Sequence, residues 1–297
     1  MSKRDYTLIV NPRSGNGKGL RVLKRVRHAF DTVGAKVNVN ITQGPGDAVK
    51  LARELPLSES DGLGIIGGDG TLHEVVNGLM QRSSPFPPIG VIPAGTGNSV
   101  HQHFNIFDPG EATQRILQGK TAALDLAKIT AGLETSYAAN VIGWGVFVDI
   151  NQTAERWRIL GSARYTLAAL KHIVTHKKRL AKFLIGDRVI TEEILLAAVC
   201  NTQFTGKGMR LAPQADAHDG KLDVVLVKQP GRREILELFR RVFAGSHLSL
   251  PSVEYHQVES FSLHHEEDDT LTIDGELKGQ TPFQVDVIPG AIQIFAK

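Results

Sequence analysis

The sequence predicts an α/β fold followed by an all-β fold: a doubly wound parallel sheet at the N-terminus, then an antiparallel β-sandwich. Short apolar runs alternate with helical patterns in the first half, and short strand-like runs separated by turn residues follow in the second. A chain of 297 residues is long enough for two domains, each with its own core. Because the pattern changes near residue 125, we predict domains at residues 1–124 and 125–297.

The N-terminal half reads as repeated β–α units. Each apolar run is followed by a segment whose apolar residues recur every three or four positions, the spacing of a helix with one buried face. The predicted strands are residues 6–10, 36–41, 62–66 and 89–93, and the predicted helices are residues 20–30, 47–55 and 72–80. In such a sheet ligands bind at the carboxyl ends of the strands, so the loops after the strands are the expected binding region.

The C-terminal half has short strand-like runs separated by turn residues, which favours an antiparallel sandwich or barrel. These runs are residues 123–129, 136–141, 193–199, 222–228, 260–263, 271–273 and 283–287. Helical patterns cover residues 153–178 and 232–243. The last apolar run, residues 291–295, reads as a strand that could return to the first domain or stay in the second.

The composition excludes several classes of protein. With 41% hydrophobic and 22% charged residues, the chain has the balance of a globular protein and not of a disordered or fibrous one. A net charge of +3 is too small to predict a nucleic-acid partner. No apolar run has the roughly 20 residues of a membrane span, and no signal peptide is recognisable, so we expect a cytoplasmic protein. The single cysteine, Cys200, has apolar neighbours and is expected to be a buried thiol.

The segment GGDGT at residues 67–71 comes directly after a predicted strand and opens a predicted helix. Glycines without a Cβ atom let main-chain N–H groups approach an anion, and the positive helix end would face it. Thr71 and Glu74 have the spacing of a capping box. Asp69 would then bind magnesium beside a phosphate or accept a proton, although a tight turn with a capping aspartate is the alternative.

Two further glycine-rich turns follow predicted strands. PAGTGN at residues 93–98 follows the fourth strand, and NPRSGNGKG at residues 11–19 follows the first. The second of these is not a Walker A loop, because Lys18 precedes a glycine, and its glycine spacing is not that of a dinucleotide-binding loop. Since neighbouring parallel strands end at one edge, we expect the turns at 67–71 and 93–98 to line one crevice.

Five motifs, in order, give the chain its resemblance to a known family. The motifs are NPRSGNGKG, GGDGTLHEVVNGL, PAGTGN, PQADAHDGKLDVVLV and IDGE, and they span nearly the whole chain. Together they resemble the diacylglycerol kinase catalytic-domain family, which includes bacterial lipid kinases and the eukaryotic sphingosine and ceramide kinases. The resemblance implies that ATP lies between the two domains, that its γ-phosphate passes to a lipid hydroxyl, and that Mg2+ is required. It also implies a lipid substrate at the membrane surface and peripheral contact with the inner membrane face.

The resemblance also assigns roles to individual residues. Nucleotide contacts are implied for Asn11, Pro12, Arg13, Ser14, Gly15, Thr42, Gly67, Gly68, Asp69, Gly70, Thr71, Leu72, His73 and Thr96. The implied magnesium ligands are the Asp219 carboxylate and the main-chain carbonyls of Asp216 and Lys221; by itself this segment reads as an Asp-Gly turn. Glu276 is the implied proton acceptor, with Asp274 as its support or replacement, and in some relatives the residue matching Asp69 takes this role.

Two other functions remain open. A soluble-substrate kinase similar to NAD kinase would share the Gly-Gly-Asp-Gly turn, but the PAGTGN, DGKLD and IDGE segments favour a lipid kinase. A nucleotide-binding regulatory module without catalysis would have no use for the carboxylates of Asp69, Asp219, Asp274 and Glu276 together. The sequence identifies neither the acceptor lipid nor the oligomeric state.

Several charged segments allow more than one interpretation. The helical pattern at residues 153–178 is strongly basic and could lie on an anionic membrane, but packing of its apolar stripe on the sandwich is favoured. The acidic run at residues 266–269 is read as a solvated turn. His101 and His103 are expected at the surface, since exposure is the more common state of an isolated histidine.

Overall fold

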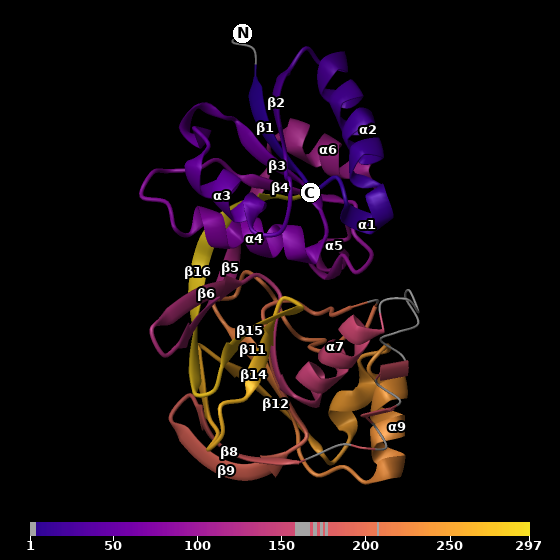
Figure 1. The fold of residues 1–297 in the computed structure, drawn as a ribbon, viewed down its shortest axis with the longest axis vertical. Coiled ribbons are helices and arrows are strands. Elements are labelled where there is room, and N and C mark those ends of the chain that lie inside the picture. The colour runs from indigo at the N-terminus through magenta and orange to yellow at the C-terminus, as the bar shows by residue number, and fades with distance from the viewer. Residues whose placement is uncertain (1–3, 158–166, 169–170, 173–174, 176–177, 207) are drawn as a thin grey trace. The chain divides into compact units, whose positions relative to one another are not determined.

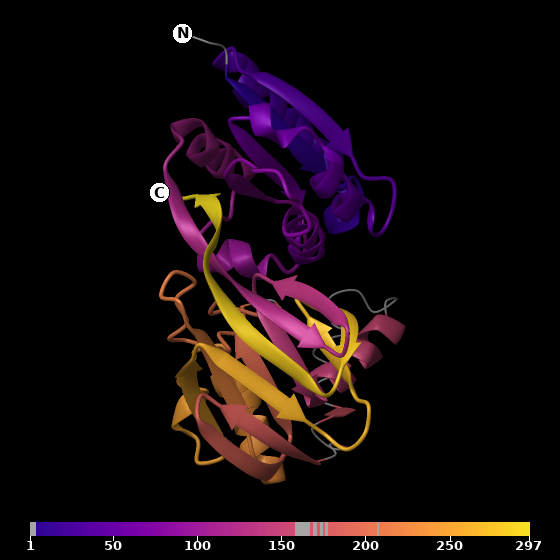
Figure 2. The same cartoon turned by 90° about the vertical axis from the view of Figure 1, so that its left-hand side faces the viewer.

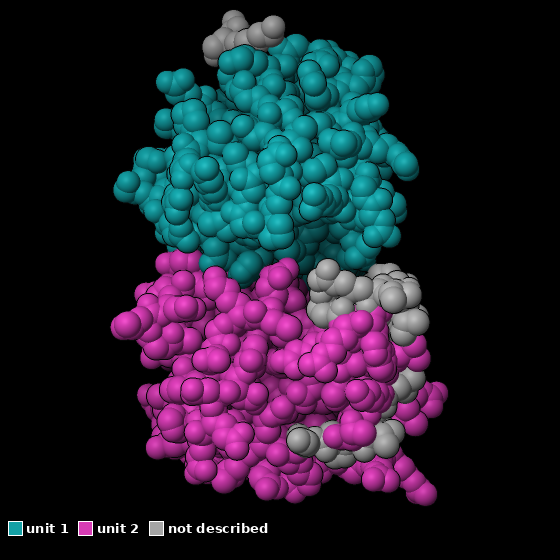
Figure 3. Space-filling model, viewed as in Figure 1, with its two compact units in different colours: residues 1–126, 289–297 teal, residues 127–288 magenta. Residues whose placement is uncertain are grey.

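The computed structural model describes residues 4–157, 167–168, 171–172, 175, 178–206 and 208–297. The chain forms two compact units (Figure 3). Unit 1 comprises Met1–Leu126 and Pro289–Lys297, and unit 2 comprises Ala127–Ile288. The C-terminal end of the chain therefore belongs to the first unit.

Unit 1 contains a parallel sheet with the strand order β2, β1, β3, β4. These strands are β1 (Asp5–Val10), β2 (Lys36–Ile41), β3 (Gly62–Gly67) and β4 (Ile89–Pro93). Every residue of β3 and β4 is buried, as expected for central strands covered on both faces. The last strand, β16 (Phe283–Phe295), reaches unit 1 with its C-terminal end, where Ile294 pairs in parallel with Ile89 of β4.

Helices between the strands of unit 1 pack in pairs. The helices are α1 (Ser14–Gly17), α2 (Gly19–Thr32), α3 (Asp47–Glu54), η1 (Leu57–Glu59), α4 (Asp69–Leu79), α5 (Ser99–His103) and α6 (Pro109–Gln118). Helix α2 packs against α6, and α3 packs against α4 (Figure 1). This is the doubly wound α/β arrangement that the alternating pattern predicts.

Unit 2 is an antiparallel β-sandwich. One sheet has six strands in the order β12, β11, β10, β7, β14, β15. Its strands are β7 (Val141–Gly145), β10 (Leu196–Cys200), β11 (Leu222–Val227), β12 (Val253–Val258), β14 (Thr270–Ile273) and β15 (Glu276–Gln280). The other sheet joins β5 (Thr121–Ala131), β6 (Glu134–Ala138), β8 (Arg179–Ile185), β9 (Arg188–Ile194), β13 (Ser260–His264) and the first part of β16 (Figure 2).

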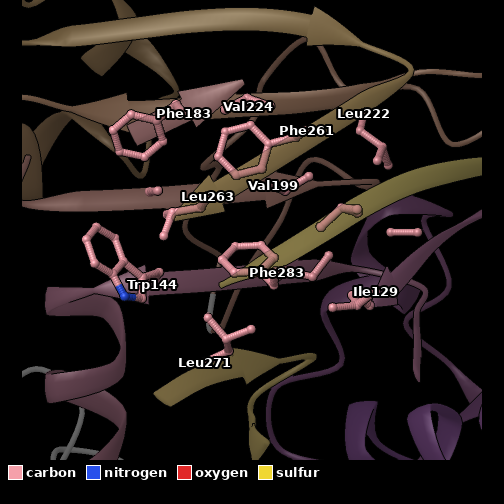
Figure 4. Close-up of a cluster of buried hydrophobic side chains, with 14 of the residues drawn as sticks. Ile129, Trp144, Phe183, Val199, Leu222, Val224, Phe261, Leu263, Leu271 and Phe283 are labelled. Atoms are coloured by element: carbon pink, nitrogen blue, oxygen red, sulfur yellow. The ribbon is translucent and has the colours of Figure 1, made fainter. Parts of the chain in front are cut away.

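The sandwich core lies between these two sheets (Figure 4). Trp144, Val224 and Leu271 come from the six-stranded sheet, and Phe183 and Phe261 come from the other. Side chains from both sheets thus interdigitate, as in a sandwich formed by two aligned sheets.

The six-stranded sheet also carries a second buried cluster, to which two helical segments contribute. Ile235 of α9 (Arg232–Arg241) belongs to the cluster, and the partly buried Val146 of α7 (Val146–Arg156) packs against it. Cys200 lies in this cluster, and burial raises the pKa of its thiol, which confirms the predicted buried cysteine. Because β7, β10 and β11 are covered on both faces, every one of their residues is buried.

Several predicted elements of the second half differ from the structure. The predicted strand at 136–141 covers parts of β6 and β7, the one at 193–199 covers parts of β9 and β10, and the two at 283–287 and 291–295 are both within β16. Strands β8, β12 and β15 were not predicted.

The basic helical pattern at residues 153–178 is only partly within the described residues. There α7 begins at Val146, before the predicted start, and ends at Arg156. Most of the remaining predicted helix lies outside the described residues. In the part of the chain that the structure describes, no helix is both long and apolar enough to cross a bilayer.

Candidate active site

The loops that follow β1, β2, β3 and β4 leave the same edge of the parallel sheet, because these four strands are adjacent and parallel. Main-chain hydrogen bonds continue the pairing into the loops. The N–H of Thr42 donates to Val10 O at 2.9 Å, and the N–H of Asn11 donates to Ile66 O at 2.9 Å. The predicted nucleotide-binding residues of unit 1 are therefore brought together at one edge.

The turns after β3 and β4 touch through their glycines. A Cβ atom on Gly68 would lie 2.9 Å from Gly95 Cα, and one on Gly95 would lie 2.5 Å from Gly68 Cα. The carbonyl oxygen of Gly67 accepts from the N–H groups of Ala94 at 2.8 Å and Gly95 at 3.1 Å. These glycines are thus required for close packing of the two turns.

The loop after β1 joins the same group. Gly15 has φ +56°, and a Cβ atom there would lie 2.1 Å from the carbonyl oxygen of Ala94. The Asn11 side chain accepts from the N–H of Arg13 at 3.0 Å and donates to Thr71 Oγ1 at 3.0 Å. Asn11 thereby ties the first loop to the start of α4.

Asp69 connects the start of α4 with the start of α5. Its Oδ1 accepts from the N–H groups of Ser99 at 2.7 Å and Val100 at 3.4 Å, and its Oδ2 accepts from the Ser99 hydroxyl at 3.3 Å. A Cβ atom on Gly97 would lie 2.8 Å from Asp69 Oδ2, so the carboxylate also borders the PAGTGN turn. Asp69 is therefore fixed between the two glycine-rich turns.

The N-cap residue of α4 is a glycine. Gly68 is in extended conformation and has no side chain that could cap the first turn. The first N–H groups of a helix have no acceptor within the helix, and they coincide with the positive end of its dipole. This end of α4 has the properties of an anion-binding site.

The predicted capping box of Thr71 and Glu74 is wrong. Glu74 instead accepts from the N–H groups of Gly46 at 3.0 Å and Ala48 at 3.1 Å, so it caps α3. The helix starts at Asp69, which places Glu74 on the second turn, facing the helix that packs against α4.

Other predicted nucleotide residues differ in exposure. Leu72 and His73 are buried within α4, whereas Arg13 and Thr96 are exposed and Ser14 is buried. The expectation of a surface position for His101 is wrong: this residue is 2% exposed. Burial lowers its pKa to about 4, with the main chain of Ile92 acting in the opposite direction.

In unit 2, the turn after β14 is anchored by Asp274. Both carboxylate oxygens of this buried residue accept main-chain N–H groups, from Ala139 at 3.0 Å, Asn140 at 2.9 Å and Val141 at 3.0 Å. Asp274 itself adopts φ 52°, in the left-handed region. Glu276 follows at the start of β15 and is exposed. The two predicted catalytic carboxylates of this motif thus lie in different environments.

Asn151 of α7 supports the same turn and was not predicted. Its side-chain amide donates to Gly275 O at 2.7 Å and to Thr272 Oγ1 at 3.0 Å. It therefore fixes the residue immediately before Glu276. No sequence signal marks it, because a polar residue in a helical segment is ordinary.

The predicted metal loop lies at the same end of the six-stranded sheet as this turn. Cys200 pairs with both Val141 and Asp223, and Ile273 pairs with Ile142. The loop at 216–221 precedes β11, and the turn at 274–275 follows β14, so both are at this end. The Thr202 hydroxyl donates to Asn140 Oδ1 at 2.6 Å, and this bond links the loop after β10 to the residue that precedes β7 at the same end of the sheet.

The loop at 216–221 forms closed turns. Asp216 Oδ1 accepts from the N–H of His218 at 3.1 Å, and Asp219 Oδ1 accepts from the N–H of Lys221 at 2.9 Å. A carboxylate with main-chain carbonyls is a donor set that suits a hard cation such as Mg2+. Among the described residues, no three His, Cys, Asp or Glu side chains converge on a metal position. Asp216, Asp219 and Lys221 as magnesium ligands stay a prediction.

A buried acidic residue, Asp223, adjoins this loop and was also not predicted as part of the site. Tyr255 and Gln257 donate to its Oδ1. The pKa of Asp223 is raised above its ordinary value. Burial is the largest cause, and the charges of Asp219 and Asp216 act in the same direction, whereas the hydrogen bonds from Tyr255 and Gln257 lower the pKa.

Comparison with known families gives matches over both units. Residues 5–129 match the diacylglycerol kinase catalytic domain, and residues 140–296 match the YegS C-terminal NAD kinase beta sandwich-like domain. The second match alone covers more than half of the chain.

Individual relatives share about a quarter of their residues with this chain. A diacylglycerol kinase of Bacillus subtilis is 26% identical over 279 residues, covering 93% of this chain and 90% of the relative. One of Mycobacterium tuberculosis is 29% identical over 301 residues, covering 97% and 94%. Sphingosine kinase 1 of Arabidopsis thaliana is 25% identical over 308 residues, covering 86% of this chain but only 63% of that longer relative.

Solved structures support the fold. A diacylglycerol kinase of Bacillus anthracis superimposes with a TM-score of 0.78 at 22% identity, covering 100% of this chain and 98% of that one. An NAD kinase of Archaeoglobus fulgidus in complex with ATP gives 0.52 at 13% identity, covering 98% and 93%. At these identities the likeness shows the fold alone.

Proposed function

Because the chain belongs to the diacylglycerol kinase catalytic-domain family, we propose that it is an ATP-dependent lipid kinase that phosphorylates a lipid hydroxyl. The observation that carries the proposal is the position of the two family matches. One covers the loops around Asp69, and the other covers the turn that carries Asp274 and Glu276. The diacylglycerol kinases of Bacillus subtilis and Mycobacterium tuberculosis match this chain over 90% and 94% of their own length, which supports a kinase of the same class.

The edge of the sheet in unit 1 supports binding of the ATP phosphates. The N-cap residue of α4, Gly68, has no side chain to cap the first turn, and the N–H groups at the positive end of a helix favour an anion. Asp69 beside these groups adds negative charge, which favours a cation between the carboxylate and the phosphates. In this proposal Asp219, with the carbonyls of Asp216 and Lys221, would hold Mg2+, which supplies charge neutralisation when it is bound.

The turn in unit 2 supports a proton acceptor. In the transfer the acceptor hydroxyl oxygen forms a bond to the γ-phosphorus, the bond to the leaving oxygen of ADP breaks, and the hydroxyl proton passes to a base. We assign this base to Glu276, which is exposed. Asp274 has both oxygens occupied by main-chain N–H groups, so we assign it the role of holding the turn.

A phosphorylation assay tests the proposal. The full chain is incubated with labelled ATP, Mg2+ and detergent-dispersed diacylglycerol, a sphingoid base, phosphatidylglycerol or a polyprenol, and separately with NAD. We expect a labelled lipid in one or more of these reactions and no labelled NAD, with turnover abolished in Asp69→Asn and in Glu276→Gln. Labelling of NAD without any lipid would instead support the soluble-substrate alternative.

A further inference from the structure

Helix α9 and the turn after it have an apolar side that is not covered. Ile235 and Val242 point into the buried cluster beneath the helix. Leu236 and Phe243 each follow one of these buried residues, about 100° further round the helix, and are 47% and 48% exposed; they are seven positions apart. Phe239, three positions after Leu236, stacks edge-on against Phe243 with ring centroids 5.8 Å apart. Leu236 and Phe243 therefore lie on one side of the helix, facing away from the core.

Unpaired positive charge surrounds these apolar side chains. Arg232, Arg233 and Arg240 are exposed, and each lies three or four positions from Leu236, so they share the side of the helix that carries Leu236. Within the described part of the chain, none of these three arginines is in an ion pair with another residue.

The two acidic residues of α9, Glu234 and Glu237, have partners other than these three arginines. Glu237 pairs with Arg241, and Glu234 accepts from the N–H of Ser252 at 3.2 Å. The outer side of α9 therefore combines exposed apolar side chains with uncompensated positive charge.

We propose that this surface, made of Arg232, Arg233, Leu236, Arg240 and Phe243, docks on an anionic lipid bilayer. Arginines at such a surface bind lipid phosphates, while leucine and phenylalanine enter the boundary between headgroups and acyl chains. A second copy of the chain fits less well, because pairing two identical surfaces would bring like charges together. The proposal assigns a membrane contact that does not depend on which lipid is phosphorylated.

Vesicle sedimentation without ATP tests this docking surface. The full chain is mixed with vesicles of phosphatidylcholine alone, or of phosphatidylcholine with an equal part of phosphatidylglycerol. We expect binding to the anionic vesicles, weakened by salt, and little binding to the neutral ones. The double variant Arg233→Glu/Arg240→Glu should bind the anionic vesicles at least about tenfold more weakly, because each arginine near the surface contributes to attraction. Leu236→Ser/Phe243→Ser should also weaken binding.

Matched controls come from the β8–β9 hairpin of the same unit. Leu180 and Val189 are 52% and 60% exposed, and Arg188 is an exposed arginine at the same hairpin. Leu180→Ser/Val189→Ser and Arg188→Glu should bind as the unmodified protein does. All variants should keep the melting temperature of the unmodified protein and its turnover of a detergent-dispersed acceptor. These two measurements separate a failure of docking from a failure of the proposed kinase function.

Three results would overturn the proposal. One is equal binding by the unmodified protein and the Arg233→Glu/Arg240→Glu variant, and another is equal binding to neutral and anionic vesicles. The third is a combination of two observations. Analytical ultracentrifugation shows that the unmodified protein is a dimer and that Leu236→Ser/Phe243→Ser is a monomer, and neither the unmodified protein nor any variant binds vesicles.

Discussion

Asp69 accepts hydrogen bonds from Ser99 at both carboxylate oxygens, from the main-chain N–H at 2.7 Å and from the hydroxyl at 3.3 Å. The residue that begins α4 is thus fixed to the residue that begins α5. This position gives Asp69 a structural role in addition to the catalytic or metal-binding role that the sequence predicts. Substitutions can separate the two roles, because an amide keeps an acceptor oxygen but loses the charge.

For Asp69→Asn we expect a stable protein without activity. The asparagine oxygen can still accept from Ser99 N–H, so the free energy of unfolding should change by no more than about 0.5 kcal/mol. Turnover should fall by at least about 100-fold, because the carboxylate that would favour a cation beside the phosphates is lost. Urea unfolding and the lipid phosphorylation assay measure the two effects.

The matched variant Asp69→Ala removes the acceptor as well as the charge. It should lower the free energy of unfolding by about 1 kcal/mol, as loss of a helix cap does. Ser99→Ala, which removes only the hydroxyl bond, should remain active. If Asp69→Asn were fully active, the charge of Asp69 would have no part in the reaction.

Asp274 and Glu276 should respond to substitution in opposite ways. Asp274→Ala leaves three main-chain N–H groups without their acceptor, and each unsatisfied buried group costs about 1–3 kcal/mol, so we expect a loss of stability of about 3 kcal/mol or more. Glu276 is exposed, and Glu276→Gln should alter the free energy of unfolding by less than about 0.5 kcal/mol while abolishing turnover. Thermal or urea unfolding beside single-turnover kinetics measures both.

A wild-type unfolding curve for Asp274→Ala would contradict the anchoring role of this carboxylate. Asp274→Asn serves as the intermediate variant, since it keeps one acceptor oxygen. Unchanged turnover in Glu276→Gln would remove Glu276 as the proton acceptor.

The parallel sheet was predictable because the alternation of apolar runs and helical segments reflects a local property, the burial of β1, β3 and β4 on both faces. The placement of the glycine-rich turns at one edge followed from that topology. Strand boundaries in unit 2 were less predictable, since β7 and β10 are buried on both faces by the sandwich core and the helical side. Without an alternating pattern, the predicted strands at 136–141 and 193–199 merged parts of neighbouring strands.

The supporting residues of the candidate site were missed for a different reason. Asn151 contacts Gly275, and Glu74 contacts Gly46, across long stretches of sequence. Such pairs depend on how helices pack against distant turns, and no local spacing reports them. The spacing of Thr71 and Glu74 instead suggested a local pair that does not form.

Glu74 offers a direct measurement of this difference. Glu74→Ala should lower the free energy of unfolding by about 1–2 kcal/mol, because the N–H groups of Gly46 and Ala48 lose their acceptor at the start of α3. A double-mutant cycle with Thr71→Ala should give a coupling below about 0.5 kcal/mol, since the two side chains have different partners. A larger coupling would indicate the capping box that the sequence suggested.

His101 should make stability depend on pH below neutrality. Its pKa in the folded chain is about 4 because burial disfavours the charged ring, whereas a histidine in an unfolded chain titrates near about 6.5. The unfolded chain therefore takes up a proton at higher pH than the folded one. The contribution to stability is fully present above pH 6.5 and is lost as the pH falls toward 4, by up to about 3 kcal/mol.

Urea unfolding of the unmodified protein and of His101→Met at pH 7 and at pH 4.5 measures this contribution. The difference in unfolding free energy between the two proteins should shift in favour of the variant at the lower pH, because methionine fills the buried position without a proton to bind. Carboxylates also titrate in this range, but they do so in both proteins and cancel in the difference. His28→Gln, at an exposed position of α2, is the control for removal of a histidine from the chain. An equal pH dependence of His101→Met and the unmodified protein would show that His101 is not held uncharged by burial.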